Sequence, residues 1–458
     1  MTSLLNKNFW LLLILSALLT AGFTITSELS WYLAAGLFLI LLIIFFIKYP
    51  EIGIYLIAFL FPFNYFEFVY GSINVPYVDL IALILFIAWG IKRVYLYFEK
   101  GQKINLKNWP AWFFMLVFIL VCVASLINVE RASLFFSIKY LLRPVIFFYL
   151  MYVILPFNII DNLKKLFTTF KVMFTVGIGI SLMGIWSLIF PPIEGLRRAI
   201  PISIFGIYPL GTNHNLLAEV FVSLIPIALI LFWQEKDVLL KNIYLLGAFL
   251  MIGVNLLTLS RGGWLALGVE LLVLAALKYG REVKKVFASY ITYIILFLLT
   301  PAFYLMYQLM TSAIVTSSSL ARLKLIEISW ILFQEHPFLG SGIGSFTNAL
   351  WQFNWYIIEY GGVTDAHGLA FKIIAETGAL GLLSFSALLA YILFILFKGY
   401  NQSKQTQYSW LVLGCLMAVI GSLTFQLFGT GYFLAKLWLP VGLALTTLKL
   451  TKTYFVKK

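Results

Sequence analysis

The feature that most constrains this chain is a succession of apolar segments, each long enough to cross a membrane. A helical span needs roughly 20 apolar residues to cross about 30 Å of hydrocarbon, and many such runs follow one another along the sequence. Because the chain is 62% hydrophobic and only 11% charged, a soluble fold of this size would leave a large apolar surface in water. The runs lack the alternation of barrel strands. We therefore expect an all-α fold, a polytopic bundle of transmembrane helices.

The predicted bundle has about 12–14 spans, separated where Pro or charged residues interrupt an apolar run. The first run, 9–26, lacks a small-residue cleavage site and is followed at once by another span, so we interpret it as a retained span. Residues 309–366 are expected to form one large extracytoplasmic loop with short helices, within a single integral membrane domain over 1–458. The predicted spans are 9–26, 31–47, 52–66, 77–98, 110–128, 134–155, 171–190, 215–233, 242–259, 263–279, 287–308, 368–397, 408–428 and 431–449.

The distribution of basic residues orients the predicted bundle. The net charge is +14, and Lys and Arg concentrate in cytoplasmic loops. With both termini in the cytoplasm, most Lys and Arg fall in inner loops and tails, so the positive charge needs no nucleic acid partner. The partner that the composition does require is the lipid bilayer. The basic residues left on the outer side are Arg131, Arg197, Arg198, Arg261, Arg322 and Lys324.

Two outer loops carry arginines on the side where basic residues are rare. Arg261 lies in LTLSRGGWLAL, where Gly262 and Gly263 would permit a sharp turn or the close approach of a ligand. Arg197 and Arg198 lie in the loop PPIEGLRRAIPISIFGIYPLGTNHN. A guanidinium group binds phosphate through two parallel charge-assisted hydrogen bonds, so Arg261 and one of the pair are candidates for binding a pyrophosphate. The alternative is that they anchor the chain at the membrane interface.

The three histidines also fall on the predicted outer side. His367, in DAHGLAFKIIAETG, enters a span, and its neutral imidazole can take a proton from a hydroxyl group at a pH above its usual pKa of about 6.5. Asp365 or another nearby carboxylate is expected to orient it. For His214, in TNHNLLAE, a capping or packing role is as well supported as catalysis, and His336 precedes Pro337 in a tight turn. The histidines are scattered, so no metal site is predicted.

Charged residues inside the predicted spans are costly and are usually paired. Lys372 and Glu376 are four residues apart and share a helical face, so we expect them to form an ion pair. Lys139 and Arg143 are also four apart and are expected to face the interior, where they would line the path of an anionic headgroup or pair with Asp79. Such intramembrane charges also suit a transporter, which is the main alternative class.

Several of these motifs occur in an order that resembles the bacterial O-antigen ligase and polymerase family. The order is an Arg in an outer loop, SRGGW between two spans, and R-x-x-x-x-x-x-x-W with HPFLGSGIGSF; a long outer loop follows, and then H-x-x-x-x-x-x-x-AETGALGLL. The resemblance covers roughly residues 190–400, whereas the N-terminal spans match only in hydropathy. The chain has Gly368 where many relatives have Asn.

The resemblance implies a membrane glycosyltransferase that acts on the outer face of the bacterial cytoplasmic membrane, without metal or cofactor. The donor would be a glycan on an undecaprenyl-pyrophosphate carrier, and the acceptor a hydroxyl group. By motif, His367 would activate the acceptor as general base, and Arg261 with Arg197 or Arg198 would hold the pyrophosphate and stabilise its charge. Supporting roles are expected for Arg322, His336, Asp365 and Glu376.

The resemblance leaves the acceptor open. A ligase would use a glycan, lipid or protein acceptor and a polymerase another glycan repeat, and both would use the same donor. A bicarbonate or small-anion transporter of the same family is the alternative from a different class. The aromatic residues of the large outer loop suit sugar stacking better than ion passage; they are Trp351, Phe353, Trp355 and Tyr356.

Overall fold

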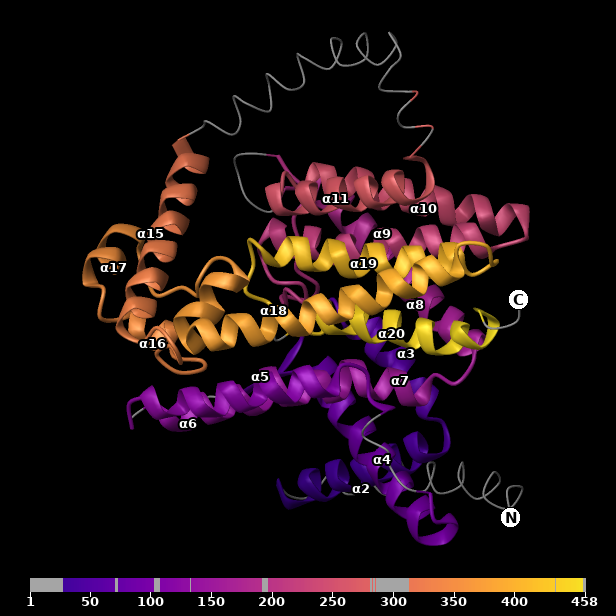
Figure 1. Cartoon of the computed structure of the whole chain (residues 1–458), viewed down its shortest axis with the longest axis horizontal. Coiled ribbons are helices and arrows are strands. Elements are labelled where there is room, and N and C mark those ends of the chain that lie inside the picture. Colours follow the sequence, from indigo (N-terminus) through magenta and orange to yellow (C-terminus); the bar gives the residue numbers. More distant parts are fainter. Residues whose placement is uncertain are drawn as a thin grey trace.

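The computed structural model is a bundle of long helices with one β-hairpin among the residues it describes (Figure 1). The hairpin pairs β1 (Glu67–Tyr70) with β2 (Ile73–Pro76) in antiparallel register. The expected all-α, polytopic fold is confirmed. The structure describes residues 28–70, 73–102, 108–131, 133–191, 197–280, 282, 285, 313–432 and 434–455.

Two helices form the centre of the bundle. Most side chains of α9 (His214–Gln234) and α19 (Ser409–Gln426) are buried, and α19 has its most extensive packing against α9. Gly414 in α19 permits this contact, because a Cβ atom there would clash with Ile230 of α9. Three further helices pack around this pair; they are α8 (Leu163–Ile189), α10 (Val238–Leu257) and α11 (Arg261–Lys278).

The remaining long helices cover the other faces of this core. The helix α18 (Leu369–Ser403) lies between α5 (Trp112–Ser125), α19 and α20 (Ala435–Phe455). Figure 1 shows α2 and α4 grouped away from the central helices, below α5. The N-terminal helices are α2 (Glu28–Lys48), α3 (Pro50–Leu60) and α4 (Tyr77–Lys100).

The described residues contain fewer complete spans than the sequence predicted. Six helices are long and apolar enough to cross a membrane, or up to seven if α2 and α3, which meet at 110°, form one broken span. The predicted spans 9–26 and 287–308 lie outside the described residues. The segment 110–128 forms the short α5 and the turn η2 (Leu126–Asn128). The helices α11 and α20 each contain three charged residues, which lowers their apolar character.

The predicted span 134–155 is also divided. It begins as α6 (Leu134–Tyr140), continues through the π-helical turns η3 (Leu141–Phe147) and η4 (Tyr149–Ile154), and ends in α7 (Leu155–Ile159). Pro144 has no N–H to donate, which favours wider turns here. Lys139, predicted to face the interior, is exposed, and Asp79 accepts a hydrogen bond from Tyr152 at 2.6 Å.

A break in α18 anchors the large loop to the bundle. Gly378 has φ 65, a left-handed conformation that interrupts the helix. The chain after α15 fills the break: the Ala379 N–H donates to the Pro337 carbonyl, and the Ser341 N–H donates to the Ala375 carbonyl, both at 2.9 Å. The backbone groups released by the break therefore find partners in this loop.

The described part of the predicted loop 309–366 is helical. Besides the short helices α16 (Phe346–Leu350) and α17 (Asn354–Tyr360), it contains α15 (Ala313–Glu335), which is 23 residues long. The three helices share a small core of their own, which includes Leu325, Ile328 and Tyr356. Figure 1 shows them together at one side of the bundle.

The helix ends gather at two opposite ends of the bundle. At the loop end, where α9, α11 and α18 begin, the Ala199 N–H donates to the Leu257 carbonyl at 2.8 Å. At the far end, where these helices finish, Lys278 donates to the Ser409 hydroxyl at 2.9 Å. The loop end is on the left in Figure 1, next to α15 and α16. The segments that carried the sequence motifs all reach this end.

Candidate functional site

Three arginines and two histidines from separate segments meet at the loop end; we call them the Arg–His cluster. Arg198 Nη1 lies 3.4 Å from His214 Nε2. The charges of Arg198, Arg322 and Arg261 all act on the His214 imidazole, and that of Arg322 also acts on His367. The cluster draws on the α8–α9 loop, α9, α11, α15 and the residues before α18. Tertiary packing thus joins residues that are up to 169 positions apart, from 198 to 367.

The backbone before α11 places Arg261 at the first position of its helix. Leu259 has φ 56 and makes the turn out of α10. Ser260 caps α11 by accepting the Gly263 N–H, and its hydroxyl donates to Asn215 of α9 at 2.7 Å. The turn predicted for the glycines therefore falls on Leu259, and Gly263 instead permits close helix packing, since a Cβ atom there would lie 2.7 Å from that of Ala218.

The structure separates the two neighbouring arginines of the α8–α9 loop. The backbone is held on both sides, since the Ala199 N–H bonds to α10 and the Ile200 N–H donates to Ser187 at 3.0 Å. Arg198 is half-buried beside His214, and burial lowers the pKa of its guanidinium group. Arg197 is exposed. Of the two, Arg198 is the member of the cluster.

Arg322 has a more central place than its predicted supporting role. It projects from α15, and burial, followed by the nearby charge of Arg261, lowers the pKa of its guanidinium group. Arg261 in turn donates to Ser319, one turn earlier on α15, at 3.2 Å. Within the described part of the chain, Arg322 Nε is buried and has no hydrogen-bond partner. A buried donor without a partner is costly, so this nitrogen is suited to an anionic ligand.

His367 is fixed by the backbone around it. Gly368 has φ 105, and a Cβ atom there would lie 2.9 Å from the Leu427 carbonyl oxygen, so the position favours glycine. The imidazole donates a hydrogen bond to the Phe428 carbonyl, two residues after α19 ends. Burial, and then the charge of Arg322, lower the pKa of His367 below its usual 6.5. The ring is therefore neutral at pH 7 and can accept a proton.

The carboxylates near His367 have other partners than the sequence suggested. Asp365 forms a salt bridge with Lys372 at 2.5 Å, although its charge still acts on His367. The expected pair of Lys372 and Glu376 is present but longer, at 3.9 Å. One oxygen of Glu376 instead accepts the Phe346 N–H at 3.3 Å. The buried Lys372 and Glu376 and the partly buried Asp365 connect the segment before His367 with α18 and the large loop.

His336 does not join the cluster. It ends α15 with an exposed side chain, and its carbonyl accepts the Gly340 N–H at 2.8 Å. The tight turn expected at this motif is therefore present, whereas a contact of the His336 ring with the cluster is not found among the described residues. His214, for which the sequence offered capping as an alternative, is not the cap itself: Asn213 caps α9 by accepting the Asn215 N–H at 2.9 Å.

The electrostatics of the cluster favour an anion. All three arginines act on His214 with the same sign, and no carboxylate is among the described groups that act on it. Three guanidinium groups close together repel one another unless a negative group lies between them. Among the described residues, no group of three or more His, Cys, Asp and Glu side chains is placed to hold a metal ion.

The fold and the cluster define a class, that of a multi-pass helical membrane protein with a basic site at one end of its bundle. Residues 246–386 match the family model of the O-antigen ligases (Wzy_C), a segment that includes Arg261, Arg322 and His367. The match covers less than a third of the chain, and it supports the O-antigen ligase/polymerase family. The match supports an O-antigen ligase-like membrane glycan enzyme, a glycosyltransferase-like ligase or polymerase. No curated protein matches the chain.

Two features of the cluster escaped the sequence interpretation. Arg322 was assigned a supporting role, although the R-x-x-x-x-x-x-x-W pattern of the resemblance begins with it. His214 was given no defined partner, because its contact with Arg198 joins two parts of one irregular loop region. In both cases the sequence did contain a signal, namely an arginine on the predicted outer side: Arg322 within the family motif, and Arg198 in the loop before His214.

Proposed function

We propose that the Arg–His cluster transfers a glycan from an undecaprenyl-pyrophosphate carrier to a hydroxyl acceptor, with His367 as general base. The observation that carries this proposal is the convergence of three arginines on His214, with Arg322 also beside His367 and no carboxylate among the described groups that act on His214. A pyrophosphate ester is a doubly negative group that such a site would bind.

The arginines would hold the pyrophosphate. Arg198, Arg261 and Arg322 each present a planar fork that can bind phosphate oxygens through paired hydrogen bonds. They come from a loop and two helices, so they can surround the group rather than contact one side. Negative charge grows on the pyrophosphate as it leaves, and fixed guanidinium groups in a half-buried site stabilise that charge without reorganisation.

His367 would act on the acceptor. Its imidazole nitrogen takes the proton of the acceptor hydroxyl, and the oxygen forms a bond to the anomeric carbon of the donor sugar. The bond from that carbon to the pyrophosphate oxygen breaks, and the carrier pyrophosphate leaves with the electron pair. The lowered pKa of His367 keeps the ring neutral before the step, and the bond to the Phe428 carbonyl orients it.

The large loop would supply part of the sugar-binding surface. Trp351 and Trp355 have exposed fractions of 63% and 42%, so their rings are available for stacking on a sugar. Tyr356 is buried in the core of the loop, and Phe353 packs against that core. Of the four aromatic residues suggested by the sequence, the two tryptophans are therefore the better candidates.

The orientation of the bundle belongs to the same proposal. We place the loop end on the outer face of the cytoplasmic membrane, with both termini in the cytoplasm, because Lys and Arg then favour the inner loops. Residues 1–458 would form one membrane domain, with 309–366 as its extracytoplasmic loop. The transporter alternative has less support, since two of the buried lysines have structural partners: Lys372 binds Asp365, and Lys436 binds Glu219 at 3.2 Å. Among the described buried carboxylates, only that of Glu270 in α11 has both of its oxygens without a hydrogen-bond partner.

The test compares glycan pools in a strain that lacks this protein with those of its parent. Polyprenyl-linked glycans and finished surface polysaccharide are extracted and measured side by side. Accumulation of lipid-linked single repeats without long chains would indicate a polymerase. Accumulation of long lipid-linked chains that fail to reach the final acceptor would indicate a ligase. Unchanged pools would contradict the proposal and favour the transporter.

A further inference from the structure

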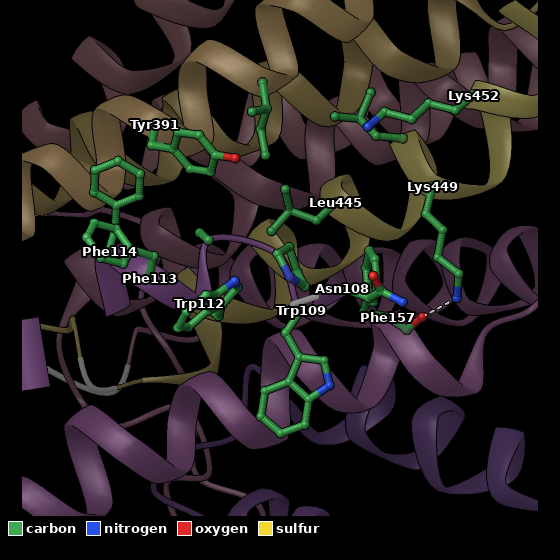
Figure 2. Close-up of a pocket in the computed structure, with 14 residues that line it drawn as sticks. Asn108, Trp109, Trp112, Phe113, Phe114, Phe157, Tyr391, Leu445, Lys449 and Lys452 are labelled. Carbon is green, nitrogen blue, oxygen red and sulfur yellow. Dashed lines mark hydrogen bonds between the residues drawn. The ribbon is translucent and has the colours of Figure 1, made fainter. Parts of the chain in front are cut away.

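The far end of the bundle contains a pocket with no part in the Arg–His cluster. It encloses about 420 Å³ between the start of α5, the second half of α18 near Tyr391 and Ile395, and the last turns of α20. Figure 2 shows aromatic rings of α5 and α18 on one side, two lysines on the other, and Leu445 between them. The lining residues used below are Trp109, Phe114, Tyr391, Leu445, Lys449 and Lys452.

The pocket lies across the bundle from the cluster. Tyr391 is 22 positions after Leu369 on α18, which corresponds to about 33 Å along a helix. That length is close to the hydrocarbon thickness of a bilayer, about 30 Å. Trp109 precedes α5 at the same end, where tryptophan is typical of the membrane interface. The pocket therefore opens at the level of the headgroups on the side opposite to the cluster.

The polarity of the pocket changes in one direction. Along α20 the lining passes from Leu445 to Lys449 and Lys452, over about 10 Å. Phe114 and Tyr391 stack with ring centroids 4.7 Å apart and form the apolar side. Among the described residues that line the pocket, none carries a carboxylate. An amphipathic ligand with a negative headgroup matches both halves.

Both lysines can still bind a ligand. Lys449 donates one hydrogen bond to the Phe157 carbonyl (Figure 2) and lies 4.8 Å from the centre of that ring. An ammonium group has three N–H bonds, so two of them are left for a phosphate. Lys452, about one turn nearer the C-terminal end of α20, is exposed. The Phe157 contact holds Lys449 in place at the pocket.

The opposite wall is fixed before any ligand binds. Ala111 is buried and has φ 57, a conformation that is costly for a residue with a Cβ atom. The preceding Pro110 carbonyl accepts a hydrogen bond from Tyr149 at 2.5 Å. A strained backbone that neighbouring residues hold in place is typical of a binding site.

We infer that this pocket binds one anionic phospholipid of the membrane, with its phosphate on Lys449 and Lys452 and an acyl chain against Leu445, Phe114 and Tyr391. Charge complementarity selects the headgroup, and the apolar half of the pocket selects a lipid over free phosphate. The occupant is independent of the glycan donor, since it lies at the other end of the bundle. The inference therefore stands or falls separately from the proposed function.

The test uses photoreactive lipids on the full-length protein in nanodiscs of neutral lipid. A phosphatidylglycerol with a diazirine in its acyl chain is crosslinked, and the labelled peptides are identified by mass spectrometry. We expect labelling at α5 near Phe114 and at α18 near Tyr391, and several-fold less labelling by the matching phosphatidylcholine probe. Excess inorganic phosphate should leave the labelling unchanged.

Three variants test the lysines. Lys452→Gln removes an exposed charge and should reduce labelling about fivefold, the usual effect of one basic residue at an anionic surface. Lys449→Gln with Lys452→Gln should reduce it further. Lys236→Gln, on the exposed α9–α10 loop at the same end, is the control and should match the parent protein.

Four results would overturn the inference. They are equal labelling by the two lipid probes, labelling spread evenly around the bundle, displacement by inorganic phosphate, and normal labelling of both the single and the double lysine variants. Because Lys449 also bonds to Phe157, the Lys452 variant alone decides the question if the double variant fails to fold.

Discussion

The two ends of this bundle concentrate positive charge in different ways. At the loop end, three half-buried arginines from separate segments act on His214, and one of them, Arg322, also acts on His367. At the far end, two lysines follow one another on the single helix α20, beside interfacial aromatic rings. A guanidinium fork in a half-buried site fixes the geometry of its ligand, whereas exposed ammonium groups contribute mainly charge. On the two proposals, the glycan site takes its charges from converging segments, whereas the lipid pocket takes both of its charges from one helix.

The largest effect is expected at His367. The change His367→Ala removes the proposed base, and glycan transfer should fall by about 10²–10⁴-fold, measured with lipid-linked donor and purified protein. His336→Ala is the matched control, because the His336 ring is exposed and outside the cluster, and it should keep normal activity. Equal activities of the two variants would contradict the assignment of His367 as the general base.

A second test separates the neighbouring arginines. Arg198→Ala should reduce transfer about 10²-fold, the usual cost of losing one fixed donor to a developing negative charge. Arg197→Ala should stay within about twofold of the parent protein, because the Arg197 side chain is exposed. The measurement is the initial transfer rate at equal amounts of folded protein. A larger loss for Arg197 would show that the loop arginines are wrongly assigned.

A third test asks whether the cluster needs the fork or only the charge. Arg322→Lys keeps the positive charge but loses the paired hydrogen bonds, so transfer should fall about tenfold. The same kind of change at the far end, Lys452→Arg, should leave phospholipid labelling nearly unchanged, because charge is sufficient there. If Arg322→Lys has no effect, the two ends use their charges in the same way.

The smallest expected effect is a shift in pH dependence. His367 must be neutral to act, and burial and Arg322 lower its pKa below 6.5. The transfer rate should therefore stay constant as the pH falls to 6.5. It should decrease only when the pH passes below the lowered pKa of His367. In Arg322→Gln the pKa should rise, so the residual activity should be lost at a higher pH. The acid limb of the pH–rate profile measures this, and an unchanged midpoint would contradict the proximity of the two groups.

The sequence indicated which residues to consider for the site, but it did not indicate their contacts. Arg261 and His367 were recognisable because basic and imidazole groups on the outer side of a membrane protein are rare, and both belong to motifs of the family. The partner of Lys372 was not recognisable: a spacing of four residues favoured Glu376, yet Asp365, which precedes the helix, lies closer. Helical spacing predicts only which residues are neighbours on the same helix. It does not predict contacts with a loop that folds back onto that helix.

The membrane class followed from the sequence because hydropathy is a local property of each segment, and tertiary packing does not change it. The division into spans within the described residues did not, because a bend between α2 and α3 and the division of 134–155 depend on how neighbouring segments satisfy the backbone. The tertiary structure likewise decided that Arg198 joins His214 while Arg197 does not, and that Gly368 has a positive φ beside the Leu427 carbonyl. These outcomes depend on φ angles and on contacts between distant segments, which composition and spacing do not encode.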